Sequence, residues 1–286
     1  MHKFLIAALL MTCGSLAHAQ FMPEKLTPIG EKIEAAVKGD IRTAEERARD
    51  GERKPRQTLE FFGLRDDMRV LELIPSGGWY TKILAPVLAD KGELHVAIGT
   101  ARAIEPMIKD VPALAKVKVA QTDAKFAPAA GQMGKFDLGD FSLGVKDLDL
   151  VLTFRNYHNL TPAARASLNK AVFAALKSGG TYGVVDHTRR HNEPESTENW
   201  RRMDPVLVVK EVQAAGFVLE DFSNLHYIPD DELRYEVGRR SVTGNTDRFA
   251  LRFGVRPLEW HSELTPRTRQ RNWAAIAAGE ASVVVG

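Results

Sequence analysis

The stretch that decides the fold is Arg69-Val-Leu-Glu-Leu-Ile-Pro-Ser-Gly-Gly-Trp-Tyr-Thr-Lys-Ile-Leu84. An apolar run ends in a Pro-Ser-Gly-Gly turn and a helical pattern follows, which predicts a strand over 69–73 and a helix over 79–89. A turn with little side-chain bulk lets a ligand approach the backbone, and the N–H groups at a helix start favour electron-rich groups. Two interpretations are open, a cofactor-binding turn and a plain structural turn between a strand and a helix.

The residues of this stretch resemble motif I of the class I S-adenosylmethionine-dependent methyltransferases. In that family an acidic residue ends the first strand and glycines follow it, so the resemblance gives Glu72 the acidic place and Gly78 the last glycine place. Ile74 and Ser76 stand at the other two glycine places. Three further strings resemble a narrower group of predicted methyltransferases. They are Gly77-Gly-Trp-Tyr-Thr-Lys-Ile-Leu-Ala-Pro86, Phe154-Arg-Asn-Tyr-His-Asn159 and Gly183-Val-Val-Asp-His187. The resemblance runs from about residue 45 to about residue 256.

The resemblance implies an α/β fold. We expect a Rossmann-like, doubly wound, mostly parallel seven-stranded sheet with an antiparallel last strand. The further strands are predicted at 93–98, 117–120, 148–154, 181–186, 218–222 and 248–255. Helices are predicted within 31–50 and over 58–63, 103–114 and 204–215, and from Pro162 to the glycine pair Gly179-Gly180. Residues 124–147 are predicted to be a loop, and Pro86 to kink or shorten its helix.

The 286 residues, 44% of them hydrophobic, suffice for one α/β domain with extensions. We divide the chain into a signal peptide (1–19), a linker with an N-terminal helical extension (20–56), a methyltransferase-like domain (57–256) and a C-terminal tail (257–286). The basic residues of the extension are either a solvated face or part of a segment that closes over the cofactor. They are Arg42, Arg47, Arg49, Arg53, Lys54 and Arg56.

The first residues have the basic, apolar and small-residue parts of a secretory signal peptide, with cleavage expected before Gln20. An N-terminal core helix is the alternative. The signal predicts export to the periplasm or the medium, and the apolar run is too short for a transmembrane helix. Cys13, the one cysteine, lies inside this segment, so the mature chain has no thiol for a disulfide, a metal site or a nucleophile. A net charge of +2 predicts no general attraction to nucleic acid.

The resemblance implies S-adenosyl-L-methionine as the cofactor. Many members of the family hold the ribose with an acid at the end of the second strand, a place that falls here on Ile98. Asp123 stands where the family often recognises adenine, although a loop aspartate is also an ordinary turn residue. The candidate cofactor-binding residues are Glu72, Ser76, Gly77, Gly78, Trp79, Tyr80, Thr81, Asp123, Arg155 and Asn156. Trp79 and Tyr80 either face the cationic sulfonium or pack between helix and sheet.

Five polar or amphipathic residues, 155–159, follow the buried strand 148–154 at the edge where open α/β sheets bind ligands. His158 and His187 are the candidate bases for an acceptor oxygen or nitrogen, with Tyr157 and Asn156 positioning it. Asp186 is placed to orient a ring or hold a hydroxyl. His187, His191 and Glu193 could bind a metal, but they lie in a predicted loop, without an i, i+4 pair on a helix or a third firm ligand, so no metal is predicted.

We therefore expect an S-adenosylmethionine-dependent methyltransferase acting at oxygen or nitrogen of a small or medium acceptor. The alternative is an exported protein that keeps the fold, has lost the reaction and serves as a binding or structural module. Three features favour the alternative. The turn after the first strand lacks two of the usual glycines, Ile98 stands at the place of the ribose-binding acid, and the signal peptide predicts export. A hydrolase is disfavoured because no Gly-x-Ser-x-Gly motif is present. The expected partner is a small-molecule acceptor rather than nucleic acid, and the oligomeric state is not predicted.

Overall fold

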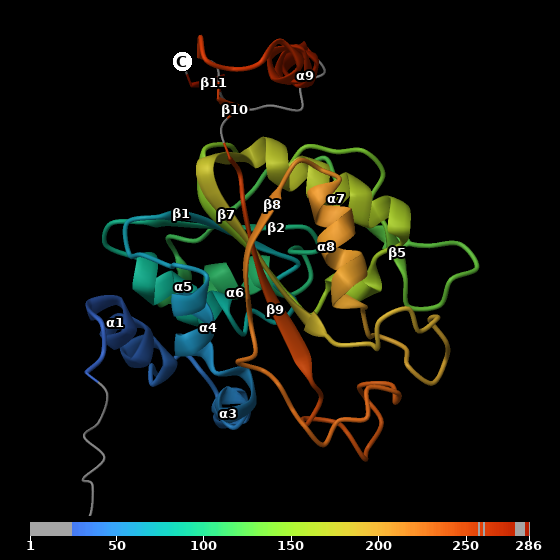
Figure 1. The fold of residues 1–286 in the computed structure, drawn as a ribbon. Coiled ribbons are helices and arrows are strands. Elements are labelled where there is room, and N and C mark those ends of the chain that lie inside the picture. The colour runs from blue at the N-terminus through green and yellow to red at the C-terminus, as the bar shows by residue number, and fades with distance from the viewer. Residues whose placement is uncertain (1–24, 257, 260, 278–283, 286) are drawn as a thin grey trace, which may run out of the picture.

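The computed structural model of the chain describes residues 25–256, 258–259, 261–277 and 284–285 (Figure 1). The predicted signal peptide lies outside the described residues, and so do Trp260 and Val283 of the tail. Within the described part of the chain, no helix has the length and apolar character needed to cross a membrane.

A seven-stranded sheet forms the centre of the molecule, in the order β3-β2-β1-β6-β7-β9-β8. Its strands are β1 (Arg69–Leu73), β2 (Glu93–Ala97), β3 (Lys118–Val119), β6 (Leu148–Phe154), β7 (Leu176–His187), β8 (Val218–Ser223) and β9 (Arg248–Gly254). β9 runs antiparallel to both of its neighbours, whereas the pairs among β3, β2, β1, β6 and β7 are parallel. The predicted fold class is confirmed, since the sheet is Rossmann-like, mostly parallel and seven-stranded, with an antiparallel last strand and helices on both faces.

Helices cover both faces of the sheet (Figure 1). One core cluster joins the sheet to α7 (Pro162–Ala175) and α8 (Pro205–Gln213). A second cluster joins the opposite face to α1 (Pro28–Val37), α4 (Pro55–Phe61), α5 (Thr81–Leu88) and α6 (Ile104–Asp110). Two short helices, α2 (Ala44–Arg47) and α3 (Asp50–Arg53), connect α1 to α4.

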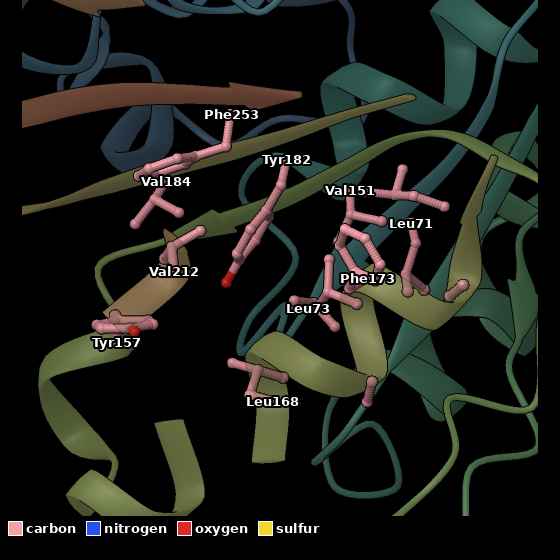
Figure 2. Packing of buried hydrophobic residues seen from close by; sticks show 14 of the residues in the cluster. Leu71, Leu73, Val151, Tyr157, Leu168, Phe173, Tyr182, Val184, Val212 and Phe253 are labelled. Carbon is pink, nitrogen blue, oxygen red and sulfur yellow. The ribbon is translucent and has the colours of Figure 1, made fainter. Parts of the chain in front are cut away.

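Alternation along β1 divides its side chains between the two faces. Leu71 and Leu73 join the cluster below α7, where Figure 2 shows them near Phe173, whereas Val70 joins the cluster below α5. Glu72 has the same parity as Val70 and therefore points to the α5 face. All four residues are buried, so the end of β1 brings a carboxyl group into the interior.

The glycine pair 179–180 does not end a helix, contrary to prediction. α7 ends at Ala175 and β7 begins at Leu176, which pairs with Leu148 of β6. The register then shifts, and Gly179 has a φ of +73°, a conformation that glycine adopts without a steric penalty. The glycines therefore form an irregularity inside a long strand, which propensity alone does not distinguish from a helix end.

Two other segments differ in detail from the prediction. The segment 124–147 contains a short antiparallel pair, β4 (Ala127–Pro128) with β5 (Phe136–Asp137), rather than loop alone. α5 contains Pro86 and ends two residues after it, at Leu88. Short 3₁₀ turns occupy Pro112–Leu114 and Tyr157–Asn159. The described tail holds α9 (Pro266–Ala277) and the parallel pair of β10 (Leu258–Glu259) with β11 (Val284–Val285), beyond the end of β9 at the top of Figure 1.

Candidate functional site

A cavity of about 620 Å³ opens at the carboxyl edge of the sheet. It is lined by residues that follow β1, β6 and β7, by the α2–α3 segment and by residues of the loops around 134–136, 200–201 and 237. Its volume lies in the range of small-molecule pockets. The cavity brings together nine of the predicted site residues, which are Glu72, Ser76, Gly77, Trp79, Tyr80, Arg155, Asn156, His158 and His187.

The turn after β1 presents backbone donors to this cavity. Ile74, Ser76 and Gly78 all have positive φ, which turns the chain sharply between β1 and α5. The N–H of Gly78 donates to the Pro75 carbonyl oxygen at 2.9 Å, but no hydrogen bond joins the N–H of Ser76 or Gly77 to any residue that the structure describes. Because Ser76 and Gly77 line the cavity, the turn offers two unused donors near a helix start.

Gly78 lies on the other side of the turn and does not line the cavity. A Cβ at this position would lie 2.4 Å from Met107 Cε and 3.0 Å from Ile104 Cδ1, both on α6. Its φ of +74° also favours glycine. The glycine at position 78 therefore permits the turn to pack against α6.

Glu72 lines the cavity at the end of β1 and is only 3% exposed. The Thr81 hydroxyl donates to its Oε2 at 2.6 Å, which ties β1 to the first turn of α5. Burial raises the pKa of Glu72 to about 8, and the Thr81 hydrogen bond opposes that rise. Glu72 is therefore mostly protonated at pH 7.

His158 and Asp186 form a buried pair in the wall of the cavity. His158 Nδ1 lies 2.6 Å from Asp186 Oδ1, and the His158 backbone N–H donates to Asp186 Oδ2 at 2.9 Å. Asp186 is fully buried and also accepts from the His187 backbone N–H at 2.7 Å. The aspartate thus fixes the orientation of the His158 ring, one of the two roles that the sequence predicted for it.

His187 lies beside this pair, with 5.9 Å between the two imidazole centroids. Its Nδ1 is 2.9 Å from the Thr246 hydroxyl oxygen. Burial lowers the pKa of His187 well below its usual value, and the nearby His158 and Arg248 lower it further. His187 is therefore neutral at pH 7.

Tyr157 lies outside the cavity, so the positioning role predicted for it is wrong for this site. Its side chain is fully buried in the cluster below α7 and α8, as Figure 2 shows. The hydroxyl donates to Glu211 Oε2 at 3.0 Å and accepts from Asn169 Nδ2 at 2.8 Å. The 3₁₀ turn after β6 explains the difference, because it directs His158 and Tyr157 to different surroundings.

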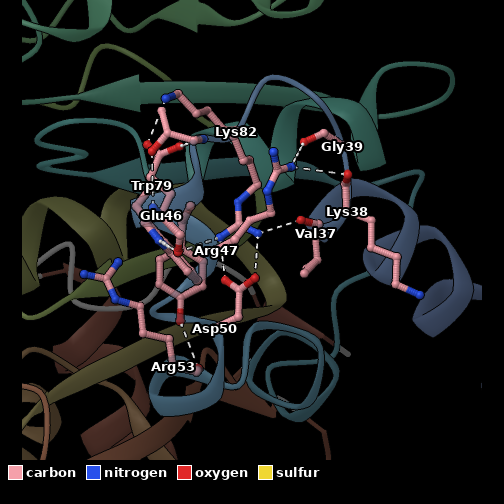
Figure 3. Close-up of polar contacts among 12 residues, drawn as sticks. Val37, Lys38, Gly39, Glu46, Arg47, Asp50, Arg53, Trp79 and Lys82 are labelled. Carbon is pink, nitrogen blue, oxygen red and sulfur yellow. Dashed lines mark hydrogen bonds and ion pairs between the residues drawn. The ribbon is translucent and has the colours of Figure 1, made fainter.

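The N-terminal extension forms one wall of the cavity. Trp79 Nε1 donates to the Glu46 carbonyl oxygen at 2.9 Å, and Lys82 Nζ pairs with Glu46 Oε1 at 2.8 Å (Figure 3). Tyr80 stacks on Phe154 with ring centroids 3.6 Å apart. The guanidinium groups of Arg42 and Arg53 lie 4.7 Å and 4.3 Å from the Trp79 ring. Both aromatic residues therefore make packing contacts within the protein, and both also line the cavity.

Two of the basic residues for which a solvated face and a closing segment were both open are buried. Arg42 is 1% exposed and bonds the Asp50 carboxylate, with Nη1 to Oδ2 at 2.9 Å. Arg53 is 4% exposed and lines the cavity together with Glu46 and Arg49. The alternative prediction, that the extension closes over the site, agrees with this arrangement. The sequence could not choose between the two alternatives, because the charges of short helices look alike whether they are buried or exposed.

Arg155 and Asn156 reach the cavity from the end of β6. Arg155 has a φ of +59° and its backbone N–H donates to the Val185 carbonyl oxygen at 2.7 Å. Asn156 Nδ2 donates to the Ile74 carbonyl oxygen at 2.9 Å, which joins the end of β6 to the turn after β1. The two polar segments expected at this edge are thus directly bonded to each other.

The ends of β2 and β3 lie outside the cavity. Ile98 is 3% exposed and packs in the core, and the Phe126 ring lies against Gly99, where a Cβ would be 3.6 Å from its Cε1. Asp123 accepts from the Ser142 backbone N–H at 2.6 Å and does not line the cavity. The place that the resemblance gives to ribose and adenine is therefore occupied by apolar packing and by a loop hydrogen bond.

No cluster of three metal-ligating side chains occurs among the described residues. His191 Nδ1 lies 3.0 Å from Asp204 Oδ2, which also accepts from the Asn192 backbone N–H. His191 is therefore bonded at the start of α8, away from His187.

No protein-family model matches the chain, and no curated protein matches its sequence. Solved structures with a similar fold include an S-adenosylmethionine-dependent methyltransferase from Aquifex aeolicus, at 15% identity over 79% of this chain and 98% of that one, with a TM-score of 0.49. The cyclase SpnF is 16% identical over 77% and 86% of the two chains, with a TM-score of 0.49. Human N-acetylserotonin methyltransferase is 13% identical over 80% and 56%, with a TM-score of 0.46. At these values the likeness concerns the fold and carries no argument about chemistry.

Proposed function

We propose that the chain is an S-adenosylmethionine-dependent methyltransferase that methylates an oxygen or nitrogen of a small-molecule acceptor, with His158 as the base. The observation that carries the proposal is the His158–Asp186 pair, 2.6 Å between Nδ1 and Oδ1, in a cavity next to the two unused N–H groups of the turn after β1. A general base held in one orientation by a buried carboxylate is an arrangement that proton abstraction requires.

The hydrogen bonds of the pair favour one tautomer of His158. A proton on Nδ1 is donated to Asp186, which leaves Nε2 as the acceptor of a proton from the acceptor molecule. The developing charge on the imidazole is then stabilised by the Asp186 carboxylate. Asp186 is itself held by two backbone N–H groups, so it needs no rearrangement during the transfer.

Part of the cavity has the groups that the cofactor's amino-acid end requires. The free N–H groups of Ser76 and Gly77 are donors for a carboxylate, and Asn156 lies beside them. S-adenosylmethionine, when bound, supplies an electrophilic methyl group, and the protein aligns the acceptor and excludes water. The rest of the lining, which includes Trp200 and Arg201 from the loop after β7 and residues of the α2–α3 segment, is suited to excluding water.

A specific observation favours the alternative, an inactive fold that serves as a binding module. Ile98 replaces a ribose-binding acid, and Phe126 covers Gly99 at the end of β2. An adenosine group could bind there only after Phe126 moves. The two candidates therefore differ in a measurable property, which is binding of the cofactor.

Titration calorimetry of the purified chain with S-adenosylmethionine and S-adenosylhomocysteine tests the proposal. We expect micromolar binding of at least one ligand, and loss of binding in Gly77→Asp, which adds a carboxylate beside the free N–H groups. Gly51→Asp is the matched control, since no atom lies within 4 Å of a Cβ there and Gly51 does not line the cavity. Absence of binding to the parent chain, with an unchanged Tm, would favour the inactive fold.

Export through cleavage before Gln20 is also part of the proposal. It rests on the amino-acid pattern of residues 1–19 alone. N-terminal sequencing of the protein recovered from the periplasmic fraction of an expressing bacterium tests it. A mature chain that begins at Met1 would contradict export.

A further inference from the structure

Three arginine side chains line the cavity without a carboxylate partner. They are Arg49, Arg53 and Arg155, and no ion pair joins any of them to a residue that the structure describes. Arg53 is 4% exposed, and its Nε has no hydrogen-bond partner within the described chain. Arg201, by contrast, lies 3.5 Å from Glu236. The first three guanidinium groups are therefore available for a ligand.

The carboxyl groups near the cavity do not balance this charge. Glu46 pairs with Lys82 at 2.8 Å. Asp186, which is bonded to His158, keeps one negative charge that opposes the fall in the Arg155 pKa, but one charge does not balance three guanidinium groups. Glu72 is bonded to Thr81, and because burial raises its pKa to about 8 it carries little charge at pH 7. The wall of the cavity is therefore cationic.

The arginines also disturb one another. Burial, and to a smaller extent the nearby Arg155, Arg49 and Arg248, lower the pKa of Arg53 to about 8. Burial lowers the pKa of Arg155 to about 10, with Arg248 and Arg49 adding to the shift. The repulsion between like charges in a partly desolvated site decreases when an anion binds between them.

The cofactor does not carry enough negative charge to balance these arginines. S-adenosylmethionine carries a carboxylate, an ammonium and a sulfonium group, so its net charge at pH 7 is positive. One arginine paired with its carboxylate would leave the other two unbalanced. The compensating charge must then come from the second ligand.

We infer that the acceptor is an acidic small molecule whose carboxylate or phosphate group binds between Arg53 and Arg155, with its nucleophilic oxygen or nitrogen near His158. The inference rests on the proposed function. It assigns Arg155, which the sequence predicted to bind the cofactor, to the acceptor instead. The planar guanidinium fork suits both oxyanions. Arg53 is held in place by the Trp79 ring, and the Arg155 backbone by its bond to Val185.

Titration calorimetry at constant ionic strength tests the inference, with benzoate and phenyl phosphate as acidic probes and benzyl alcohol as an uncharged probe of similar size. Each probe is titrated into the full chain with and without saturating S-adenosylhomocysteine. We expect at least one acidic probe to bind at least tenfold more tightly than benzyl alcohol. Equal affinities of the charged and uncharged probes would overturn the inference.

Variants locate the site of the anion. We expect Arg155→Met to lower the affinity for the acidic probe at least tenfold, while the affinity for S-adenosylhomocysteine changes less than threefold. Arg155→Lys should give an intermediate loss of affinity for the acidic probe. Arg65→Met is the control, because Arg65 is an exposed arginine at the opposite edge of the sheet, before β1. A loss confined to S-adenosylhomocysteine would instead assign Arg155 to the cofactor and overturn the inference.

The two proposals fail differently. If S-adenosylhomocysteine binds and no acidic probe does, the inference is wrong and the methyltransferase proposal stands. If an acidic probe binds through Arg155 and neither form of the cofactor does, the cationic site stands as the site of a binding module and the methyltransferase proposal is wrong.

Discussion

The carboxyl edge of the sheet has two halves of opposite character. After β6 and β7 the chain places Arg155, His158 and His187 around an open cavity, with Asp186 buried behind His158. After β2 it places Ile98 in the core, and Phe126 stacks on Phe136 with ring centroids 4.5 Å apart. The backbone topology of the two halves is the same, parallel strands ending at one edge. The difference teaches that the residues directly after each strand, and not the sheet, decide where a ligand can bind.

The largest expected effect contrasts an aspartate in each half. Asp186→Ala removes a fully buried carboxylate that accepts three hydrogen bonds, and we expect unfolding free energy to fall by about 3–5 kcal/mol. Asp123→Ala removes one hydrogen bond from an exposed residue, and we expect a loss of about 1 kcal/mol. Urea denaturation of both variants measures the difference. Equal losses would contradict the contrast between the halves.

The next effect concerns Glu72, at the boundary between the halves. Its pKa is raised from 4.5 to about 8 in the folded chain, so the folded state keeps a proton that the unfolded state loses. The stability that this proton contributes is complete below pH 4.5 and is lost as the pH rises toward 8. Glu72→Gln cannot ionise, so its stability relative to the parent should rise by up to about 4 kcal/mol between pH 4.5 and 9.

Urea denaturation at a series of pH values measures this rise. Glu220→Gln, a substitution of a surface glutamate on β8, is the control. Parallel profiles for the parent and Glu72→Gln would show that the Glu72 carboxyl is not held protonated.

A smaller effect separates the two sides of the turn. Gly78→Ala places a methyl group 2.4 Å from Met107 at a positive φ, and we expect it to lower stability by about 2 kcal/mol. Gly77→Ala meets no atom within 4 Å, so its stability should change by less than about 0.5 kcal/mol. Since Gly77 lines the cavity, Gly77→Ala should instead lower the affinity for S-adenosylhomocysteine. Thermal unfolding with and without the ligand measures both, and the reverse order of stabilities would refute the assignment of the two sides.

The smallest effect is expected from a substitution that makes room in the apolar half of the edge, after β2. Phe126→Ala removes the ring that lies against Gly99, so a ligand that enters there no longer has to displace it. We expect S-adenosylhomocysteine affinity to rise about fivefold, or about 1 kcal/mol, in titration calorimetry. Phe222→Ala, at a phenylalanine that is 71% exposed on β8, is the control. An unchanged or weaker affinity would mean that the adenosine group does not bind beside Gly99.

Local signals in the sequence predicted most of the elements. The side chain of Thr161 caps α7 by accepting from the Ala164 N–H, and that of Asp204 caps α8 by accepting from the Val206 N–H, as their positions before a proline indicate. The strands β1 and β6 have the predicted bounds. The end of α7 was missed because Gly179 serves a strand irregularity, which depends on pairing with β6 and β9.

The candidate site was predicted in part. Ser76, Asn156, His158 and His187 meet in one cavity because parallel strands bring their carboxyl ends to one edge. The role of Arg53 was missed because it comes from a short helix far from the strands in the sequence, and its burial depends on contact with Trp79.

By itself the sequence determined the places of the seven main-sheet strands, the caps of α7 and α8 and most of the polar residues at the sheet edge, because these depend on local chemistry and periodicity. The tertiary structure alone decided that Asp186 orients His158, that Tyr157 turns into the core, and that Arg53 enters the cavity. It also decided that Phe126 lies against Gly99. Each of these contacts joins residues far apart in the sequence or depends on which face of a turn is buried. Such contacts follow from the packing of the whole domain and not from the neighbours of a residue in the chain.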